Sequence, residues 1–221
     1  MKIKISILVV TISVLFSADT LRYSARFLGI KLAEIEQINI PKNAETQFHV
    51  HSTLKWLWDL ENFYSIRIDS LKRPLKYQKI IHQPNIVDSL VEKFDWKNGK
   101  IFTRNDTVAI RKNMQTMISL LSFCATLDSS ISVPFWAEKK WITAHIKHSE
   151  KMFRGESVDY FSIHFEHNPY IPRTEETDML TEYFVKPKSR VEIWREKGMK
   201  TLFLKIKYSV ALTTLILTLD E

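Results

Sequence analysis

The sequence predicts a mainly β protein: a curved antiparallel sheet, or an open or partly closed β-barrel, with one short α-helix, after an N-terminal signal peptide. Apolar and polar residues alternate along most of the chain after residue 18, which is the period of a half-buried strand. Helical spacing of apolar residues occurs near residues 113–124. Strand–helix alternation, the mark of a doubly wound α/β fold, is absent from the pattern. We expect residues 19–221 to form a single β-rich periplasmic domain.

The first 18 residues have the three-part layout of a secretory signal peptide. Lys2 and Lys4 precede the apolar run Ile5–Phe16, and the small residues Ser17–Ala18 follow it. A membrane-spanning helix needs about 20 apolar residues, and this run is shorter. No cysteine follows the run, so a lipid anchor is not expected there. These features predict export to the periplasm, cleavage near residue 18 and no membrane span in the mature chain.

The first mature strand shows the alternation clearly, because Leu21, Tyr23, Ala25 and Phe27 share one face of Thr20–Leu28. Gly29 then interrupts the pattern, as at a strand bulge or a close backbone approach. Further strands are expected at Ile30–Ile40, Glu45–Trp58, Asn62–Asp69, Leu75–His82, Leu90–Trp96 and Ile101–Asn105. Turns are expected at Pro41–Asn43, Asp69–Pro74 and Lys97–Lys100.

The period changes in the middle of the chain. Met114, Met117, Ile118 and Leu121 fall at helical spacing and predict a helix over Asn113–Cys124 that plugs or flanks the sheet. Lys139–His148 and Lys151–Arg154 are then expected to pair with each other. The remaining strands are expected at Ser157–His167, Thr181–Lys186, Arg190–Arg195, Met199–Tyr208 and Ala211–Leu219, with a loop at Asn168–Arg173 and a hairpin turn at Glu196–Gly198.

The bulk composition narrows the function classes. Apolar residues make up 45% and charged residues 26% of the chain, which is globular rather than disordered. The net charge of +7 is spread along the chain without an arginine-rich arm, so nucleic acid is not an expected partner. The single cysteine, Cys124, has the apolar neighbours Leu121, Phe123 and Ala125 and no nearby histidine, which favours a buried structural thiol.

Histidines and carboxylates supply the candidate polar sites. His49 and His51 share one strand face, and Glu34 and Glu36 share another. Other groups are His145 with His148, His164 with Glu166 and His167, Glu175 with Glu176 and Asp178, and Asp220 with Glu221. None matches a defined zinc motif, a Gly-x-Ser-x-Gly nucleophile motif, a phosphate loop or a dinucleotide-binding glycine run. We therefore predict no catalytic residue, no metal ligand and no cofactor.

Aromatic residues are numerous for this length, and most are expected in the core. The prominent ones are Trp56, Trp58, Phe63, Tyr64, Phe94, Trp96, Phe135, Trp136 and Trp141. A curled sheet with one helix can leave an apolar groove among such side chains, and a groove of this kind binds lipids or acyl chains.

Four stretches, in this order, carry a resemblance to a known family: Arg26–Ala33, Asn62–Tyr77, Met114–Phe123 and Val191–Trp194. The first contains an aromatic-Leu-Gly-x-x-x-small pattern, and the last a Val-x-Ile-Trp strand. The second places a tyrosine, an aspartate, a proline and a tyrosine at Tyr64, Asp69, Pro74 and Tyr77.

On these motifs the chain resembles the exported bacterial proteins of the domain-of-unknown-function family 3108. The resemblance implies a periplasmic β-rich fold and supplies no catalytic residues. The sequence departs from the family pattern in two places. It lacks the Asp-x-x-Ser pattern before the helix, and it carries Arg195 and Glu196 where small or polar residues are usual.

Three functions follow as hypotheses. The first is a non-catalytic periplasmic protein of the cell envelope that binds a lipid or other apolar ligand in a β cradle, which a large, dry, apolar cavity would support. The second is a structural or assembly factor that pairs a sheet edge with another envelope protein, which a filled interior and a long unpaired edge strand would support. The third is a hydrolase with an unrecognised site, which a cleft that gathers Glu34, Glu36 and histidines would support.

Overall fold

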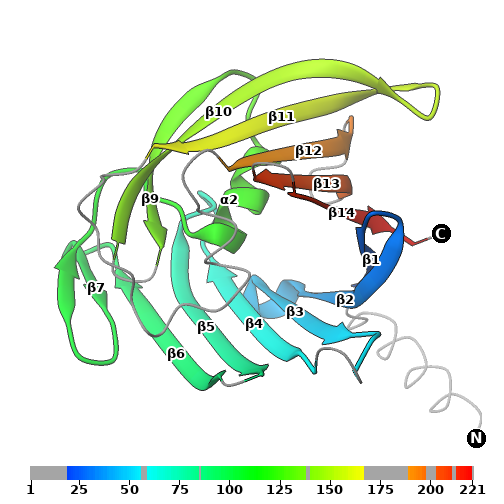
Figure 1. The fold of residues 1–221 in the computed structure, drawn as a ribbon. Helices are drawn as coiled ribbons and strands as arrows, with labels where there is room; N and C mark the ends of the chain where they lie inside the picture. Colours follow the sequence, from blue (N-terminus) through cyan, green and yellow to red (C-terminus); the bar gives the residue numbers. More distant parts are fainter. Residues whose placement is uncertain are drawn as a thin grey trace, which may run out of the picture.

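The computed structural model describes residues 19–55, 59–84, 86–137, 140–166, 189–197, 203–210 and 213–220. These residues form one 14-stranded antiparallel sheet with the strand order β8-β7-β6-β5-β4-β3-β2-β1-β14-β13-β12-β11-β10-β9. The sheet curls so that β4–β6 face β10–β13 across an interior that contains helix α2 (Figure 1). The prediction of a mainly β fold with a curved, incompletely closed antiparallel sheet and one short helix is confirmed.

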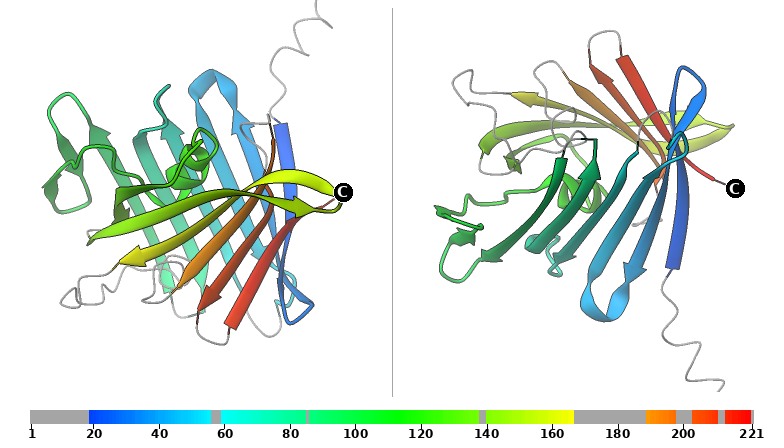
Figure 2. Two further views of the ribbon diagram at one scale, coloured as in Figure 1. Left: turned by 90° about the horizontal axis from the view of Figure 1, so that it is seen from above. Right: turned by 60° about the horizontal axis from the view of Figure 1, so that its bottom comes forward.

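The sheet consists of two halves. The N-terminal half contains β1 (Asp19–Phe27), β2 (Ile30–Ile40), β3 (Glu45–Ser52), β4 (Glu61–Ile68), β5 (Pro74–Gln83), β6 (Ile86–Asp95), β7 (Lys100–Phe102) and β8 (Thr107–Ala109). The C-terminal half contains β9 (Ile131–Ala137), β10 (Lys140–Phe153), β11 (Glu156–Glu166), β12 (Arg190–Glu196), β13 (Phe203–Val210) and β14 (Thr213–Leu219). The first and last strands pair with each other and join the halves, and Figure 2 shows the two halves from two further directions.

The two ends of the sheet, β8 and β9, are consecutive strands in the chain, and the segment between them lies where the barrel would close. Gln115 of this segment bridges β9: its N–H donates to the Pro134 carbonyl at 2.9 Å, and the Trp136 N–H donates to the Gln115 carbonyl at 2.8 Å. The Trp136 indole also donates to the buried Glu92 carboxylate of β6, at 2.8 Å. These contacts connect the two sheet ends without a continuous strand ladder.

Helix α2 (Met117–Cys124) follows this bridge and enters the interior (Figure 1). At its start the Thr116 N–H donates to the Ser119 hydroxyl at 2.8 Å. At its end the Arg195 guanidinium of β12 donates to the Cys124 carbonyl at 3.2 Å and to the Asp159 carboxylate. A cation at this position satisfies an end carbonyl that has no partner inside the helix.

The ion pair at the end of the helix affects the ionisation of Asp159. Partial burial disfavours the charged carboxylate, but the hydrogen bonds from Arg195 and His148 outweigh burial and hold the pKa of Asp159 below its usual range. The unusual Arg195 noted in the sequence therefore has a structural role, because it ties the plug helix to β11 and β12.

Several strand boundaries differ from the prediction. Leu28 and Gly29 form a two-residue hairpin turn with φ of 49° and 83°, not a bulge or a close approach, since nothing lies within 4 Å of a Cβ placed on Gly29. Arg154 and Gly155 form the equivalent turn between β10 and β11, with φ of 52° and 87°. Residues 140–153 are therefore one long strand, and the expected pairing of its two pieces is wrong.

Other differences concern element ends and two missed strands. The helix begins at Met117 rather than Asn113, and β3 ends at Ser52 rather than Trp58. The two strands that the sequence analysis does not predict are β8 and β9, which form the two edges of the sheet. β9 contains Pro134, and an edge strand tolerates the missing N–H of a proline. The signal segment 1–18, the loop at 168–173, the strand expected at 181–186 and part of the 196–198 turn lie outside the described residues.

Candidate functional site

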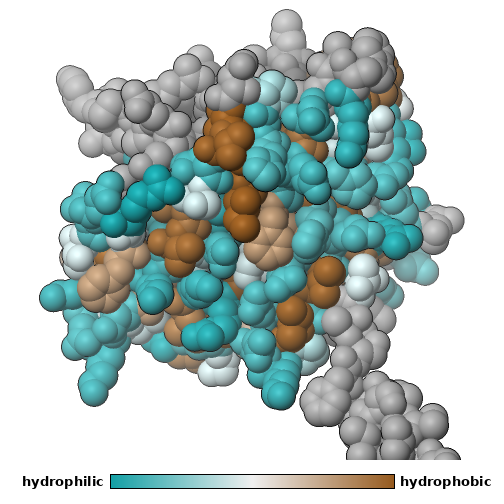
Figure 3. All heavy atoms as spheres, turned by 90° about the horizontal axis from the view of Figure 1, so that it is seen from below, coloured by the Kyte–Doolittle hydropathy of each residue, from teal (hydrophilic) through white to brown (hydrophobic). Residues whose placement is uncertain are grey.

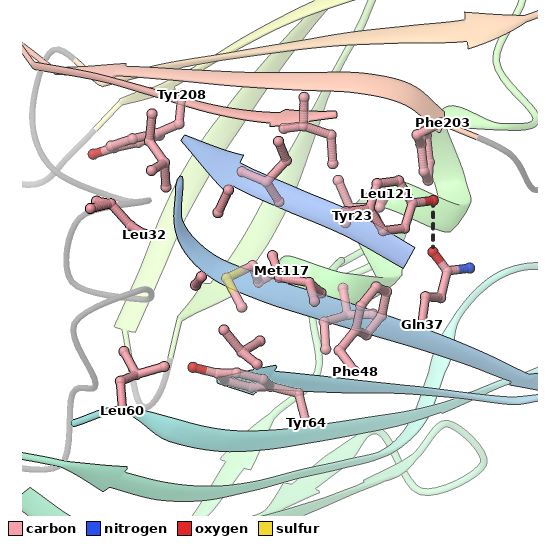
Figure 4. A pocket seen from close by; sticks show the side chains of 18 of the residues that line it. Tyr23, Leu32, Gln37, Phe48, Leu60, Tyr64, Met117, Leu121, Phe203 and Tyr208 are labelled. Carbon is pink, nitrogen blue, oxygen red and sulfur yellow. Dashed lines mark hydrogen bonds between the residues drawn. The ribbon is translucent and has the colours of Figure 1, made fainter. Parts of the chain in front are cut away.

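An apolar cavity of about 400 Å³ lies between the two halves of the sheet and beside α2. β1–β4 form one wall, β13 and β14 form the facing wall, and the first turns of the helix close one side (Figure 4). The lining side chains are those of Tyr23, Ala25, Phe27, Leu32, Ala33, Ile35, Gln37, Phe48, Val50, Ser52, Leu60, Tyr64, Met117, Ile118, Leu121, Phe203, Ile206, Tyr208, Leu215 and Leu217. None of these lining residues is an acid, a lysine, an arginine or a histidine.

The register of strands β1, β2 and β3 explains why the cavity forms. Ala25 of β1 pairs with Ala33 of β2, which pairs with Ser52 of β3, so three small side chains lie side by side on the inner face. The neighbouring row on the same strands contains Tyr23, Ile35 and Val50. The surrounding side chains of the wall are large. The three small side chains do not reach far enough to interdigitate with those facing them, as side chains in a well-packed core do, and they leave volume unfilled.

Polar groups at the cavity wall are few, and the side chains of Tyr23, Gln37 and Tyr64 are hydrogen-bonded within the protein. The Tyr23 hydroxyl donates to the Gln37 side-chain carbonyl at 3.2 Å, and the Gln37 amide donates to Asn39 at 3.0 Å. The Tyr64 hydroxyl accepts from the Asn62 amide at 3.1 Å. Burial raises the pKa of the Tyr23 phenol, so it stays neutral at physiological pH.

This composition suits binding better than covalent chemistry. A cavity of about 400 Å³ falls within the range of roughly 300–1,000 Å³ that small-molecule sites occupy. Its lining supplies hydroxyls and one amide but no general acid or base that titrates near neutral pH. An apolar molecule would gain by leaving water for this space.

The aromatic residues singled out in the sequence are mostly not the residues that line the cavity. Of the seven singled-out aromatic residues that the structure describes, only Tyr64 is among the lining residues. Phe63 lies on the outer face against His49, with ring centroids 4.9 Å apart. Phe135 packs on Phe165 in the core, at 5.0 Å. Phe94 is buried in the core, Trp96, Trp136 and Trp141 pack with it, and Trp56 and Trp58 lie outside the described residues.

The lining residues that the sequence reasoning missed include the small row and several aromatic side chains, namely Tyr23, Phe48, Phe203 and Tyr208. The alternation places the lining residues Tyr23, Ala25 and Phe27 on one apolar strand face. The sequence feature that would predict the cavity is a set of small inward-facing residues at matching positions of adjacent strands. This feature can be recognised only once the strand register is known.

The histidines of the described residues are not among the cavity lining, and most of them contact a carboxylate or an aromatic ring. His51 contacts Glu34 at 3.1 Å, and His148 contacts Asp159 at 3.2 Å. His145 stacks on His164 with centroids 4.9 Å apart, and it contacts Glu166 at 3.0 Å. His167 lies outside the described residues. In the part of the chain that the structure describes, no group of three or more His, Cys, Asp or Glu side chains is placed to hold a metal ion.

The carboxylate pair Glu34 and Glu36 does lie beside histidines, on the outer face of the sheet. Glu34 pairs across strands with His51, and Glu36 pairs with His49. A surface hollow of about 340 Å³ is lined by Glu36, His49, Val50, His51, Lys55, Glu61, Asn62, Phe63, Ile80 and His82. Hydrogen bonds from Lys31, at 2.5 Å, and from His51 lower the pKa of Glu34. An ionised carboxylate can accept a proton, but it is a poor general acid at neutral pH.

The outer hollow includes Ile80, which is exposed, as are Val87 and Val91 on the neighbouring strand β6. Figure 3 shows one face of the molecule, on which hydrophilic side chains surround scattered hydrophobic ones. Among the other carboxylates, Asp220 accepts a hydrogen bond from Ser24 at 2.6 Å. Glu175, Glu176, Asp178 and Glu221 lie outside the described residues. Cys124 is fully buried at the end of the helix, and burial raises the pKa of its thiol to about 12, as in a structural cysteine.

The fold and cavity define a barrel-like antiparallel domain whose sheet stays open. The structure is similar to a crystal structure from Brucella abortus, described as a beta-barrel-like protein of domain of unknown function DUF1849. The TM-score is 0.58 at 6% sequence identity, over 93% of this chain and 97% of that chain. This likeness shows the fold alone. That family differs from family 3108, so the resemblance found in the sequence stays a prediction.

No protein-family model matches the sequence, and no curated protein matches it significantly. Within the described residues, the structure has no helix that combines the length and hydrophobicity needed to cross a membrane.

Proposed function

We propose that this protein binds an apolar ligand, of the lipid class, in the cavity between the two halves of its sheet. The observation that carries the proposal is the row of small residues Ala25, Ala33 and Ser52, which opens about 400 Å³ of space among apolar side chains. The signal-like segment 1–18 and the resemblance to exported proteins support a place in the periplasm, where the protein would carry or shelter such a ligand without transforming it.

The two other hypotheses find less support. In the described part of the sheet, one edge strand, β8, has only three residues, and the other, β9, is bridged by Gln115. Little edge is left for strand addition. The outer hollow does gather Glu36 with histidines, but the lowered pKa of Glu34 and the pairwise contacts of the histidines favour surface ion pairs over catalysis.

The test is ligand recovery together with displacement of a fluorescent apolar probe. Protein purified from the periplasm is measured by native mass spectrometry before and after organic extraction. In parallel, the purified protein is titrated with N-phenyl-1-naphthylamine. We expect a co-purifying apolar species and saturable probe binding.

A matched pair of variants locates the binding. Ala33→Phe places a large ring in the middle of the small row and should abolish probe binding. Ala109→Phe places the same ring on the exposed edge strand β8 and should leave binding unchanged. Equal binding by both variants and the original protein would place the probe outside the cavity and refute the proposal.

A further inference from the structure

The hydroxyl of Ser52, a residue of the cavity lining, is buried and has no hydrogen-bond partner among the described residues. The residue is 3% exposed. Its backbone N–H is occupied, because it donates to the Leu60 carbonyl at 2.9 Å. Buried hydroxyls in folded proteins nearly always have a partner, so this unsatisfied group needs an explanation.

The position of Ser52 gives the cavity a direction. Through the bond to Leu60 and its pairing with Ala33, Ser52 lies at the end of the cavity where Leu32 and Leu60 are found (Figure 4). At the other end, beside Phe48 and Phe203, the polar groups of Tyr23 and Gln37 already bond to each other. A ligand with one polar group therefore finds an unpaired hydroxyl at one end and an already hydrogen-bonded pair of polar groups at the other.

The charge of the lining limits the kind of polar group. No cation is among the lining residues, and an ionised group placed there would lose its hydration without a counter-charge. A neutral oxygen loses much less hydration free energy than an ionised group, and it gains the hydrogen bond to Ser52. The volume of about 400 Å³ is at the lower end of the range for ligand sites, which suits one hydrocarbon chain rather than two.

We infer that the ligand is a single-chain lipid with a neutral oxygen, a hydroxyl or an ester carbonyl, which bonds to the Ser52 hydroxyl while the chain extends toward Phe48 and Phe203. This inference rests on the proposed function, because it concerns the same cavity. Beyond that function, it specifies that the ligand has a neutral polar group, one hydrocarbon chain and a defined orientation in the cavity.

The experiment compares three probes of equal chain length, dodecanol, dodecane and dodecanoate, as displacers of N-phenyl-1-naphthylamine. In the original protein, dodecanol should displace the dye at the lowest concentration. In Ser52→Ala the affinity for dodecanol should fall by about two- to tenfold, the worth of one neutral hydrogen bond. The affinity for dodecane should stay unchanged.

A second measurement guards against a variant that merely misfolds. Ser52→Ala removes an unsatisfied buried group, so its thermal midpoint should equal or exceed that of the original protein. Ser89→Ala, on the exposed outer face of β6, is the matched control and should change neither affinity. The same alcohol and alkane should also compete with each other for one site.

The outcomes separate the two proposals. If neither dodecanol nor dodecane displaces the dye, the proposed function itself fails. If both displace it but Ser52→Ala weakens neither, or weakens both equally, the cavity binds apolar ligands and the role of Ser52 is refuted. If dodecanoate binds more tightly than dodecanol at neutral pH, the inference of a neutral group is wrong.

Discussion

The interior of the curled sheet has two regions with the same alternating strand pattern and opposite packing. Between α2 and β9–β12, large side chains such as Phe135, Phe161 and Ile163 are fully buried against one another. Between β1–β3 and β14, the small row leaves a cavity. Alternation decides which face is inward, whereas side-chain size at matched register decides whether the inward space is filled. The helix belongs to both regions, since Met117, Ile118 and Leu121 line the cavity, whereas Leu120 and Cys124 are buried in the filled region.

The largest expected effect comes from emptying the filled region. Phe135→Ala should lower the free energy of unfolding by about 3–5 kcal/mol, because it removes a fully buried ring that contacts Phe165. Urea unfolding measures the change. Phe102→Ala removes the same ring from a side chain that is 42% exposed on β7 and should cost about 0.5 kcal/mol or less. Similar losses for both variants would mean that this region is not tightly packed.

The next largest change in the free energy of unfolding is expected at Arg195, which connects the helix to the filled region. Arg195→Met should cost about 2–3 kcal/mol, because the Cys124 carbonyl and the Asp159 carboxylate lose charged hydrogen bonds. The thiol of Cys124 reports the change locally, since it is buried and un-ionised in the native protein. A maleimide should label it faster in the variant under native conditions.

The control for this prediction is Arg22→Met, which removes an exposed arginine that forms an ion pair with Glu36, at 3.1 Å. Surface pairs of this kind contribute about 0–1 kcal/mol. Its labelling rate should match that of the original protein. An unchanged rate in Arg195→Met as well would show that Arg195 does not hold the helix in place.

The difference between the two regions also explains what the sequence predicted. The period of two identified most strands, because most inward positions are apolar whichever strand lies beside them. The strand order was not predictable, since the pairing of Asp19–Phe27 with Thr213–Leu219 joins the two chain ends and leaves no local pattern. The sequence predicted that an apolar groove could exist in the curled sheet, but not where it lies. Its cause is the alignment of Ala25, Ala33 and Ser52, and no single strand carries that information.

The cavity region should respond to added volume in the opposite sense from the filled region. Ala33→Leu should raise the free energy of unfolding by about 0.5–2 kcal/mol, the usual gain from filling a cavity, and should weaken dye binding. The urea midpoint and the dye titration measure the two effects on one sample. A loss of stability above 1 kcal/mol would show instead that the row is already well packed, and the proposed binding site would lose its physical basis.

The smallest effect is a pH dependence confined to the filled region. The pKa of Asp159 is held below its usual range, so its contribution to stability is complete above the unfolded pKa, roughly 3.9, and is lost as the pH falls through the folded pKa. The stability difference between the original protein and Asp159→Asn should therefore be constant near neutral pH and shrink in acid. The cavity variant Ala33→Leu changes no ionisable group, so its difference from the original protein should not depend on pH over the same range. If both differences shrink together, acid loosens the whole sheet and the ion pair at the end of the helix is not the responsible group. If only the Asp159→Asn difference shrinks, that ion pair stabilises the filled region independently of the cavity.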